Sequence, residues 1–334
     1  MTTSITAVTP GSYTARALAA IPGYAEQVEL VETLGTWQLH TVHSAETICD
    51  TAQFEAEIAA QIVEAARTGQ PVPELTGSAR EHLTARDAHR QIMAAHAHAV
   101  RTAEAQLATM ERDGVSFAYG WLREQLGELF TAFDELDIDP NLTAERALHE
   151  GRGAAYTSAT ELADSYLSLR NAHRQIVHLD PASAGHEKSA LSHKVAVCGQ
   201  FRNFIDADPF WVLYRRTNAR QATDATATGR AHKQWLTAAP EPFGKRVGGS
   251  PKAPRPDGIA PMAWMAHVAV NKPWLPDAAT LIEAYDLAAA AVRPGRPAVI
   301  DYQRYWWITP STKTHSGQQF TARDALAELA NSAE

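Results

Sequence analysis

The feature that most constrains this chain is a long stretch of sequence without proline. No proline occurs between residues 74 and 139, and Ser78 with Glu81 forms a capping-box pattern that predicts a helix start. A continuous helix from there would contain roughly 58 residues and extend about 85 Å at 1.5 Å per residue. A kink or break is expected at one of three glycines, Gly114, Gly120 or Gly127.

The second half of this stretch has apolar residues at alternating spacings of four and three. This heptad pattern forms an apolar seam along a helix and predicts that another helix packs against it. Because only a short turn at Pro140 precedes the next helical segment, we expect the two helices to be antiparallel. The residues predicted to form the helix interface are Leu122, Leu126, Leu129, Phe133 and Leu136.

Composition and patterning divide the chain into four regions. Residues 1–49 are expected to form an arm and a β-hairpin, because apolar and polar residues alternate around Gly35 over 27–42. A helix beginning at Asp50 opens a long-helix bundle over 50–180, followed by an aromatic and basic segment with an extended linker over 181–260. Residues 261–334 are expected to form a small α+β region with a helix after Asp277 and a strand over 298–308. The predicted fold is therefore mainly α, a long antiparallel helical hairpin or bundle, with a small α+β part built from the N-terminal hairpin and the C-terminal segment.

Two of the predicted helices share a sequence element. Over the fourteen positions from Ala79 and from Ala163, eight residues are identical, and the agreement fades after Ile92 and Ile176. One interpretation is two related helices of a bundle with the same packing chemistry. The alternative is a pseudo-symmetric anion or ligand site formed by His89, Arg90, His173 and Arg174.

Histidines are frequent, but their spacing does not predict a metal site. His82, His89 and His96 are seven residues apart, about 10 Å along a helix, whereas two ligands of one ion on a helix are three or four residues apart. A polar stripe facing solvent or another helix is the favoured interpretation. We therefore predict no metal, no cofactor and no catalytic residue, and keep as a weak alternative a hydrolytic centre using His186, His193, Asp206 or Asp208.

Basic and aromatic residues are concentrated between positions 201 and 256. This segment has ten basic and four acidic residues within a chain whose net charge is −8. Basic groups neutralise phosphates and aromatic rings stack on bases, which favours nucleic acid as one partner. A basic loop that docks on an acidic protein surface is the other interpretation. The candidate binding residues are Arg215, Arg216, Arg220, Lys245, Arg246, Lys252 and Arg255.

The two cysteines, Cys49 and Cys198, are too few for a disulfide framework and are expected to be reduced. The N-terminus lacks the pattern of a signal peptide, and no apolar run reaches the 18 residues of a membrane span. We expect a cytoplasmic protein, or a virion component if the chain is phage-encoded. The favoured function is a non-enzymatic structural or assembly protein that forms homo-oligomers or larger assemblies; nucleic-acid binding is the alternative, and no membrane partner is expected.

Overall fold

The computed structural model describes residues 11–48, 51–71, 74–222, 227–238, 243, 255–293 and 322–332, with the side chains of 38–48, 51–53, 78, 227–229 and 332 excepted. The chain forms two compact units. One unit comprises residues 22–111 and is called the hairpin unit below. The other comprises residues 1–21 and 112–334 and is called the core unit.

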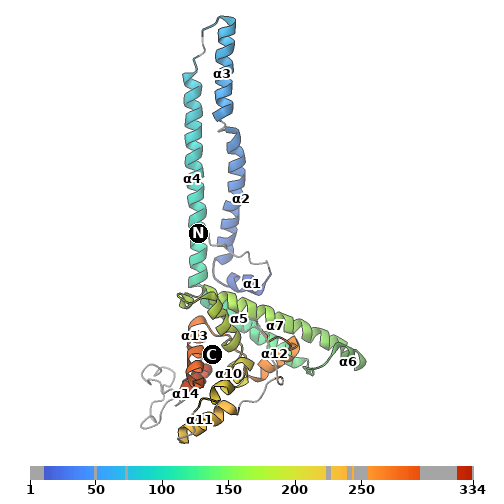
Figure 1. The fold of residues 1–334 in the computed structure, drawn as a ribbon. Helices are drawn as coiled ribbons and strands as arrows, with labels where there is room; N and C mark the ends of the chain where they lie inside the picture. Colours follow the sequence, from blue (N-terminus) through green and yellow to red (C-terminus); the bar gives the residue numbers. More distant parts are fainter. Residues whose placement is uncertain are drawn as a thin grey trace. The chain divides into compact units, whose positions relative to one another are not determined.

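The hairpin unit consists of three helices, with α2 and α3 following one another along α4 (Figure 1). Two hydrogen bonds join the start of α2 to the end of α4, so the two helices are antiparallel. The Tyr24 hydroxyl donates to Glu111 at 2.9 Å, and the Gln27 amide donates to the Ala103 carbonyl at 2.8 Å. The bounds of the helices are α2 Tyr24–Ile48, α3 Thr51–Thr68 and α4 Thr76–Asp113.

The predicted β-hairpin over residues 27–42 is wrong, because these residues belong to α2. A helical period is also present there: Gln27, Val28, Val31 and Leu34 are the partly buried positions, at the spacing of one helix face. The alternation of apolar residues around Gly35 resembles a strand pattern. In the structure these residues are helical and pack along α4. The capping-box pattern at Asp50 lies outside the described residues, but α3 occupies the helix predicted there and ends before Gly69, whose φ is +68°.

The core unit is a cluster of shorter helices that pack on α7 and α13. Its helices are α1 Tyr13–Ala19, α5 Val115–Glu135, α6 Ala144–His149, α7 Gly153–Leu179, α8 Lys188–Cys198, α9 Phe204–Ala207, α10 Pro209–Ala219, α11 Ala227–Thr237, α12 Pro261–Val270, α13 Ala278–Val292 and α14 Ala322–Ser332, with a 3₁₀ turn at Pro181–Ser183. Helix α7 packs against α1, α5 and α12, and α13 packs against α8 and α14. The mainly α prediction is confirmed.

The long proline-free stretch is broken at Gly114, one of the three predicted positions. Beyond it, α5 and α7 are antiparallel, as predicted. Phe130 lies 5.6 Å from Tyr166, and Tyr119 lies 6.1 Å from His173, between ring centroids, so residues later in α5 meet residues earlier in α7.

The C-terminal region contains the predicted helix after Asp277, whose carboxylate accepts a hydrogen bond from the Thr280 backbone N–H at 2.8 Å and caps α13. The predicted strand over 298–308 lies outside the described residues. Within the described ranges there is no β-strand, only an isolated antiparallel bridge between Phe201 and Pro273, so the α+β part of the prediction is not supported.

Candidate interaction surfaces

The predicted helix interface in α5 is used inside the core unit. Leu122, Leu126, Leu129 and Phe133 are buried, and Leu136 at the end of the helix is half-buried. Helix α5 packs against α7 and α1. The partner that this heptad pattern requires is therefore supplied by the same chain.

The copy of the repeated element in α7 holds two loops of the core unit in place. The Arg170 guanidinium is 2% exposed and donates to three backbone carbonyls, those of Gly199 at 2.9 Å, Trp274 at 2.8 Å and Gln200 at 2.6 Å. It also lies over the Tyr166 ring, 5.0 Å from its centroid. One side chain thus joins the end of α8 to the segment before α13.

His173, one turn further along α7, is fully buried and extends this network. Its Nε2 lies 2.8 Å from the Pro276 carbonyl and donates a hydrogen bond to it. Burial lowers the pKa of His173 to about 3; the charges of Arg170 and Arg123 lower it further, and the Pro276 carbonyl opposes them. A neutral ring without solvent exposure is suited to structure rather than to ligand binding.

The copy of the repeated element in α4 has a different environment. His89 is half-buried in the hairpin unit, and Arg90 forms an exposed ion pair with Asp87 at 3.1 Å. In the core unit, Arg174 is half-buried beside the fully buried His173. The His173 ring is fully buried and its Nε2 contacts the Pro276 carbonyl, and the anion or ligand site that the repeat suggested as an alternative stays a prediction.

The basic and aromatic segment is partly buried where the structure describes it, and nucleic-acid binding by this segment stays a prediction. Arg215 is 1% exposed, pairs with Asp206, donates to the Ile205 and Trp235 carbonyls and lies over the Trp235 ring. Burial thus removes one of the candidate binding residues, Arg215, from the surface.

Other members of that segment divide between three environments. Arg220 is exposed, Arg216 is half-buried, and Arg255 donates to the Ile259 carbonyl. Several of the aromatic residues that were expected to stack on bases are core residues: Phe201, Phe204 and Trp211 are each at most 1% exposed. Three candidates, Lys245, Arg246 and Lys252, lie outside the described residues.

Three of the four residues considered for a hydrolytic centre perform separate structural tasks, and the fourth, His186, is exposed. Asp208 caps α10 through the Phe210 N–H at 2.9 Å, and Asp206 pairs with Arg215. The His193 ring packs edge-on against Phe210 at 5.0 Å between centroids. Burial also raises the pKa of the Cys198 thiol well above its usual value, which makes it a poor nucleophile.

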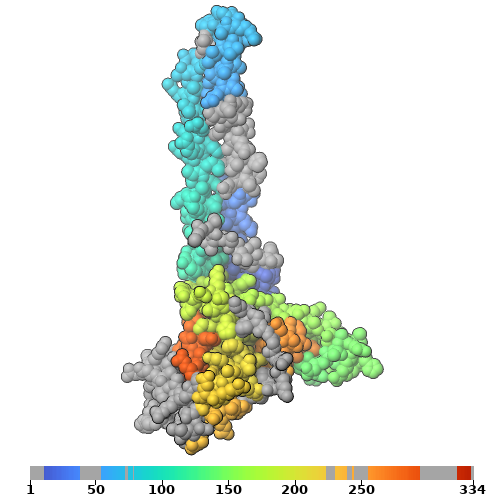
Figure 2. Space-filling view, in the orientation of Figure 1, coloured from blue at the N-terminus to red at the C-terminus, as the bar shows by residue number. Residues whose placement is uncertain are grey.

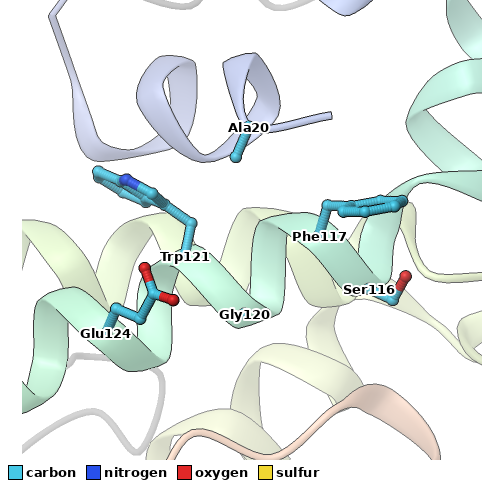
Figure 3. A pocket seen from close by; sticks show the side chains of 6 residues that line it. All are labelled: Ala20, Ser116, Phe117, Gly120, Trp121 and Glu124. Carbon is cyan, nitrogen blue, oxygen red and sulfur yellow. The ribbon is translucent and has the colours of Figure 1, made fainter. Parts of the chain in front are cut away.

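A shallow groove of about 460 Å³ lies between α1 and α5 in the core unit (Figure 3). The Phe117 and Trp121 side chains rise from α5 on either side of Gly120, and Ala20 faces them from the end of α1. Phe117 is 52% exposed, and the Arg16 guanidinium lies 5.0 Å from the Trp121 ring centroid. Its polar lining residues, Ser116 and Glu124, do not form a set of acid, base and nucleophile. The groove is therefore better suited to binding an apolar side chain than to catalysis.

The seam of the hairpin unit contains the histidines at sevenfold spacing. The His82 ring stacks on Phe54 at 4.1 Å between centroids, and His96 Nε2 lies 2.9 Å from the Leu34 carbonyl. Trp37 packs on the His96 ring at 5.5 Å. The expectation of an interhelical polar stripe is therefore met at two of the three histidines.

The hairpin unit also exposes large apolar side chains on all three helices. These side chains are 41% to 58% exposed. A two-layer hairpin has only one seam in which to bury apolar surface, so apolar side chains outside that seam face solvent unless a partner covers them. The six residues are Leu30, Trp37, Ile62, Val63, Leu83 and Ile92.

Among the described residues, no group of three or more His, Cys, Asp or Glu side chains is arranged to hold a metal ion. None of the helices described is both long and apolar enough to cross a bilayer. Comparison with protein-family models, with curated proteins and with solved structures finds no match to this chain.

Proposed function

We propose that this protein is a non-enzymatic assembly protein that associates through the hairpin unit. The observation that carries the proposal is the exposure of Leu30, Trp37, Ile62, Val63, Leu83 and Ile92 on one elongated unit. Burial of such residues at an interface contributes roughly 25 cal/mol for each Å² of apolar surface removed from water.

Electrostatics support a protein partner for this unit rather than nucleic acid. Residues 22–111 carry thirteen acidic and five basic side chains, so the net charge of the hairpin unit equals that of the whole chain, −8. The remainder of the chain is electrically balanced. An acidic hairpin unit repels the phosphates of nucleic acid. In the basic segment that favoured nucleic acid, Arg215 is buried and cannot contact phosphates.

A pair of fourfold variants tests the proposal. Replacement of Ile62, Val63, Leu83 and Ile92 with Gln is expected to weaken association at least about tenfold, equivalent to ~1.4 kcal/mol, because their apolar surface no longer gains from burial. Sedimentation velocity over a range of concentrations measures this. The wild-type chain should exceed its monomer mass of 36.3 kDa.

The matched control replaces four similarly exposed apolar residues of the core unit with Gln: Phe117, Leu148, Leu213 and Val270. This variant should associate as the wild type does. A wild-type chain that remains a monomer at every concentration would overturn the proposal. If both fourfold variants weakened association equally, the interface would not be confined to the hairpin unit.

A further inference from the structure

Helix α4 carries a second heptad pattern on a face that the hairpin does not cover. Its positions follow spacings of four and three, as in a coiled-coil interface. Ala85 is half-buried and the other positions are exposed, with Ile92 at 50%. On the face in view in Figure 2, α4 is uncovered over most of its length. These positions, called the α4 stripe, are Glu81, Ala85, Ala88, Ile92, Ala95, Ala99, Thr102 and Gln106.

The α4 stripe lies about a quarter of a turn from the seam that contains His82, His89 and His96, at 100° per residue. At 100° per residue, the charged residues of α4 between Glu81 and Glu104 project from the half of the helix opposite the α4 stripe. These residues are Arg86, Asp87, Arg90 and Arg101. A second helix that approached the stripe would therefore meet small and apolar side chains with few charges to desolvate.

The internal repeat indicates what kind of element covers such a face. Ala172 and Ile176 of α7 are the counterparts of Ala88 and Ile92, and they are 1% and 0% exposed. On that side of α7, the Thr14 hydroxyl of α1 donates to Gln175 at 2.6 Å. The same sequence element is thus buried by helices in the core unit and left exposed in the hairpin unit.

We propose that the α4 stripe is the contact between two copies of this chain, with α4 packed antiparallel on α4 of the second copy. The inference rests on the proposed function and names the partner. Its basis is self-complementarity, the property that a two-fold interface requires. With the two-fold axis beside Met93 and Ala94, each Ile92 lies opposite Ala95 of the other copy, and each Ala88 lies opposite Ala99.

The outer layers of this register are also complementary. Ala85 lies opposite Thr102, and the Glu81 carboxylate lies opposite the Gln106 amide, which is a hydrogen-bond donor. A parallel arrangement would instead place Glu81 against Glu81, which brings like charges together. It would also place Ile92 against Ile92 and alanine against alanine, so one layer would contain two large side chains and its neighbours only small ones. Small residues opposite one another permit close approach of the two helices.

Substitution of Ile92 tests the position of the interface. Ile92→Glu is expected to weaken dimerisation at least about 30-fold, because it places a carboxylate in the central layer of each half. Ala94→Glu is the matched control: Ala94 is exposed on the same helix but, at 100° per residue, projects from the half of α4 opposite the stripe. Mass is measured by light scattering, with a dimer of twice 36.3 kDa expected for the wild type and for Ala94→Glu.

Cysteine cross-linking tests the direction of the helices. In the antiparallel register a mixture of Ala88→Cys and Ala99→Cys chains should form a mixed disulfide dimer under mild oxidation. Either variant alone should stay at the wild-type background, because identical positions are separated by about 16 Å along the axis.

The outcomes separate this inference from the proposed function. A dimer that survives Ile92→Glu, or Ala88→Cys chains that cross-link with themselves, overturns the antiparallel α4 contact while leaving association through the hairpin unit intact. A monomeric wild type overturns both. Added salt should strengthen the dimer, since each hairpin unit has a net charge of −8; weakening by salt would instead indicate attraction to an oppositely charged surface.

Discussion

Arg170→Met is expected to lower the free energy of unfolding of the core unit by about 3–5 kcal/mol. The substitution removes a buried guanidinium and leaves the carbonyls of Gly199, Gln200 and Trp274 without their donor. Methionine fills much of the same volume, so the loss reports hydrogen bonds more than packing. Urea denaturation followed by tryptophan fluorescence measures it, because Trp211, Trp264 and Trp274 are buried in this unit.

The internal repeat supplies the control for this experiment. Arg86→Met makes the same chemical change at the matching position of α4, where the arginine is half-buried in the hairpin unit. Its cost is expected to stay within about 1 kcal/mol. Arg170→Lys should lie between the two, because an ammonium has the charge but not the fork that joins carbonyls on two loops. Equal losses for Arg86→Met and Arg170→Met would show that the carbonyl contacts of Arg170 contribute little.

Two buried groups are expected to give the core unit opposite responses to pH that cancel in the wild type. Burial raises the pKa of Asp208 from 3.8 to about 8, opposed by the backbone N–H groups of Phe210 and Trp211. The pKa of His173 falls from 6.5 to about 3. Between pH 3.8 and 6.5, folding releases a proton at His173 and binds one at Asp208, so the two effects on stability offset each other.

Single substitutions should expose each response. In Asp208→Asn the amide oxygen still accepts from the Phe210 N–H, and only His173 titrates. Stability should then fall by about 1.4 kcal/mol for each pH unit as the pH decreases from 6.5 toward 3. In His173→Gln only Asp208 titrates, and stability should fall at the same rate as the pH increases from 3.8 toward 8.

The measurement is the difference in free energy of unfolding between each single variant and the double variant at several pH values, so contributions from other groups cancel. The double variant should follow the wild type between pH 4 and 6.5 in slope, though not in absolute stability. A flat difference for His173→Gln would mean that the Asp208 carboxyl is ionised in the folded protein at neutral pH.

Much of the helical architecture follows from local signals. The absence of proline from 74 to 139, the heptads of α5 and the Asp277 cap each identify a helix, because they depend on residues a few positions apart. The break at Gly114 was also among the predicted positions. Alternation over 27–42 misled because a helix whose exposed face carries Leu30 and Trp37 resembles a strand in a short window.

The candidate residues show where sequence reasoning ends. The shared element with His89 and His173 is visible in the sequence, but identical residues are buried in α7 and partly exposed in α4. The buried guanidinium of Arg215 had the same appearance as the basic residues around it. Arg170 has a structural role because it donates to the carbonyls of Gly199 and Trp274, which lie on loops distant in the sequence. No local sequence pattern predicts these contacts.

Residue spacing along the chain predicts a mainly helical protein with an Ala-rich long helix and an internal repeat, because helix formation depends on residues a few positions apart. Which helix faces are covered depends instead on contacts between helices that lie far apart in the sequence. These contacts bury the heptad residues of α5 inside the core unit and leave the α4 stripe exposed.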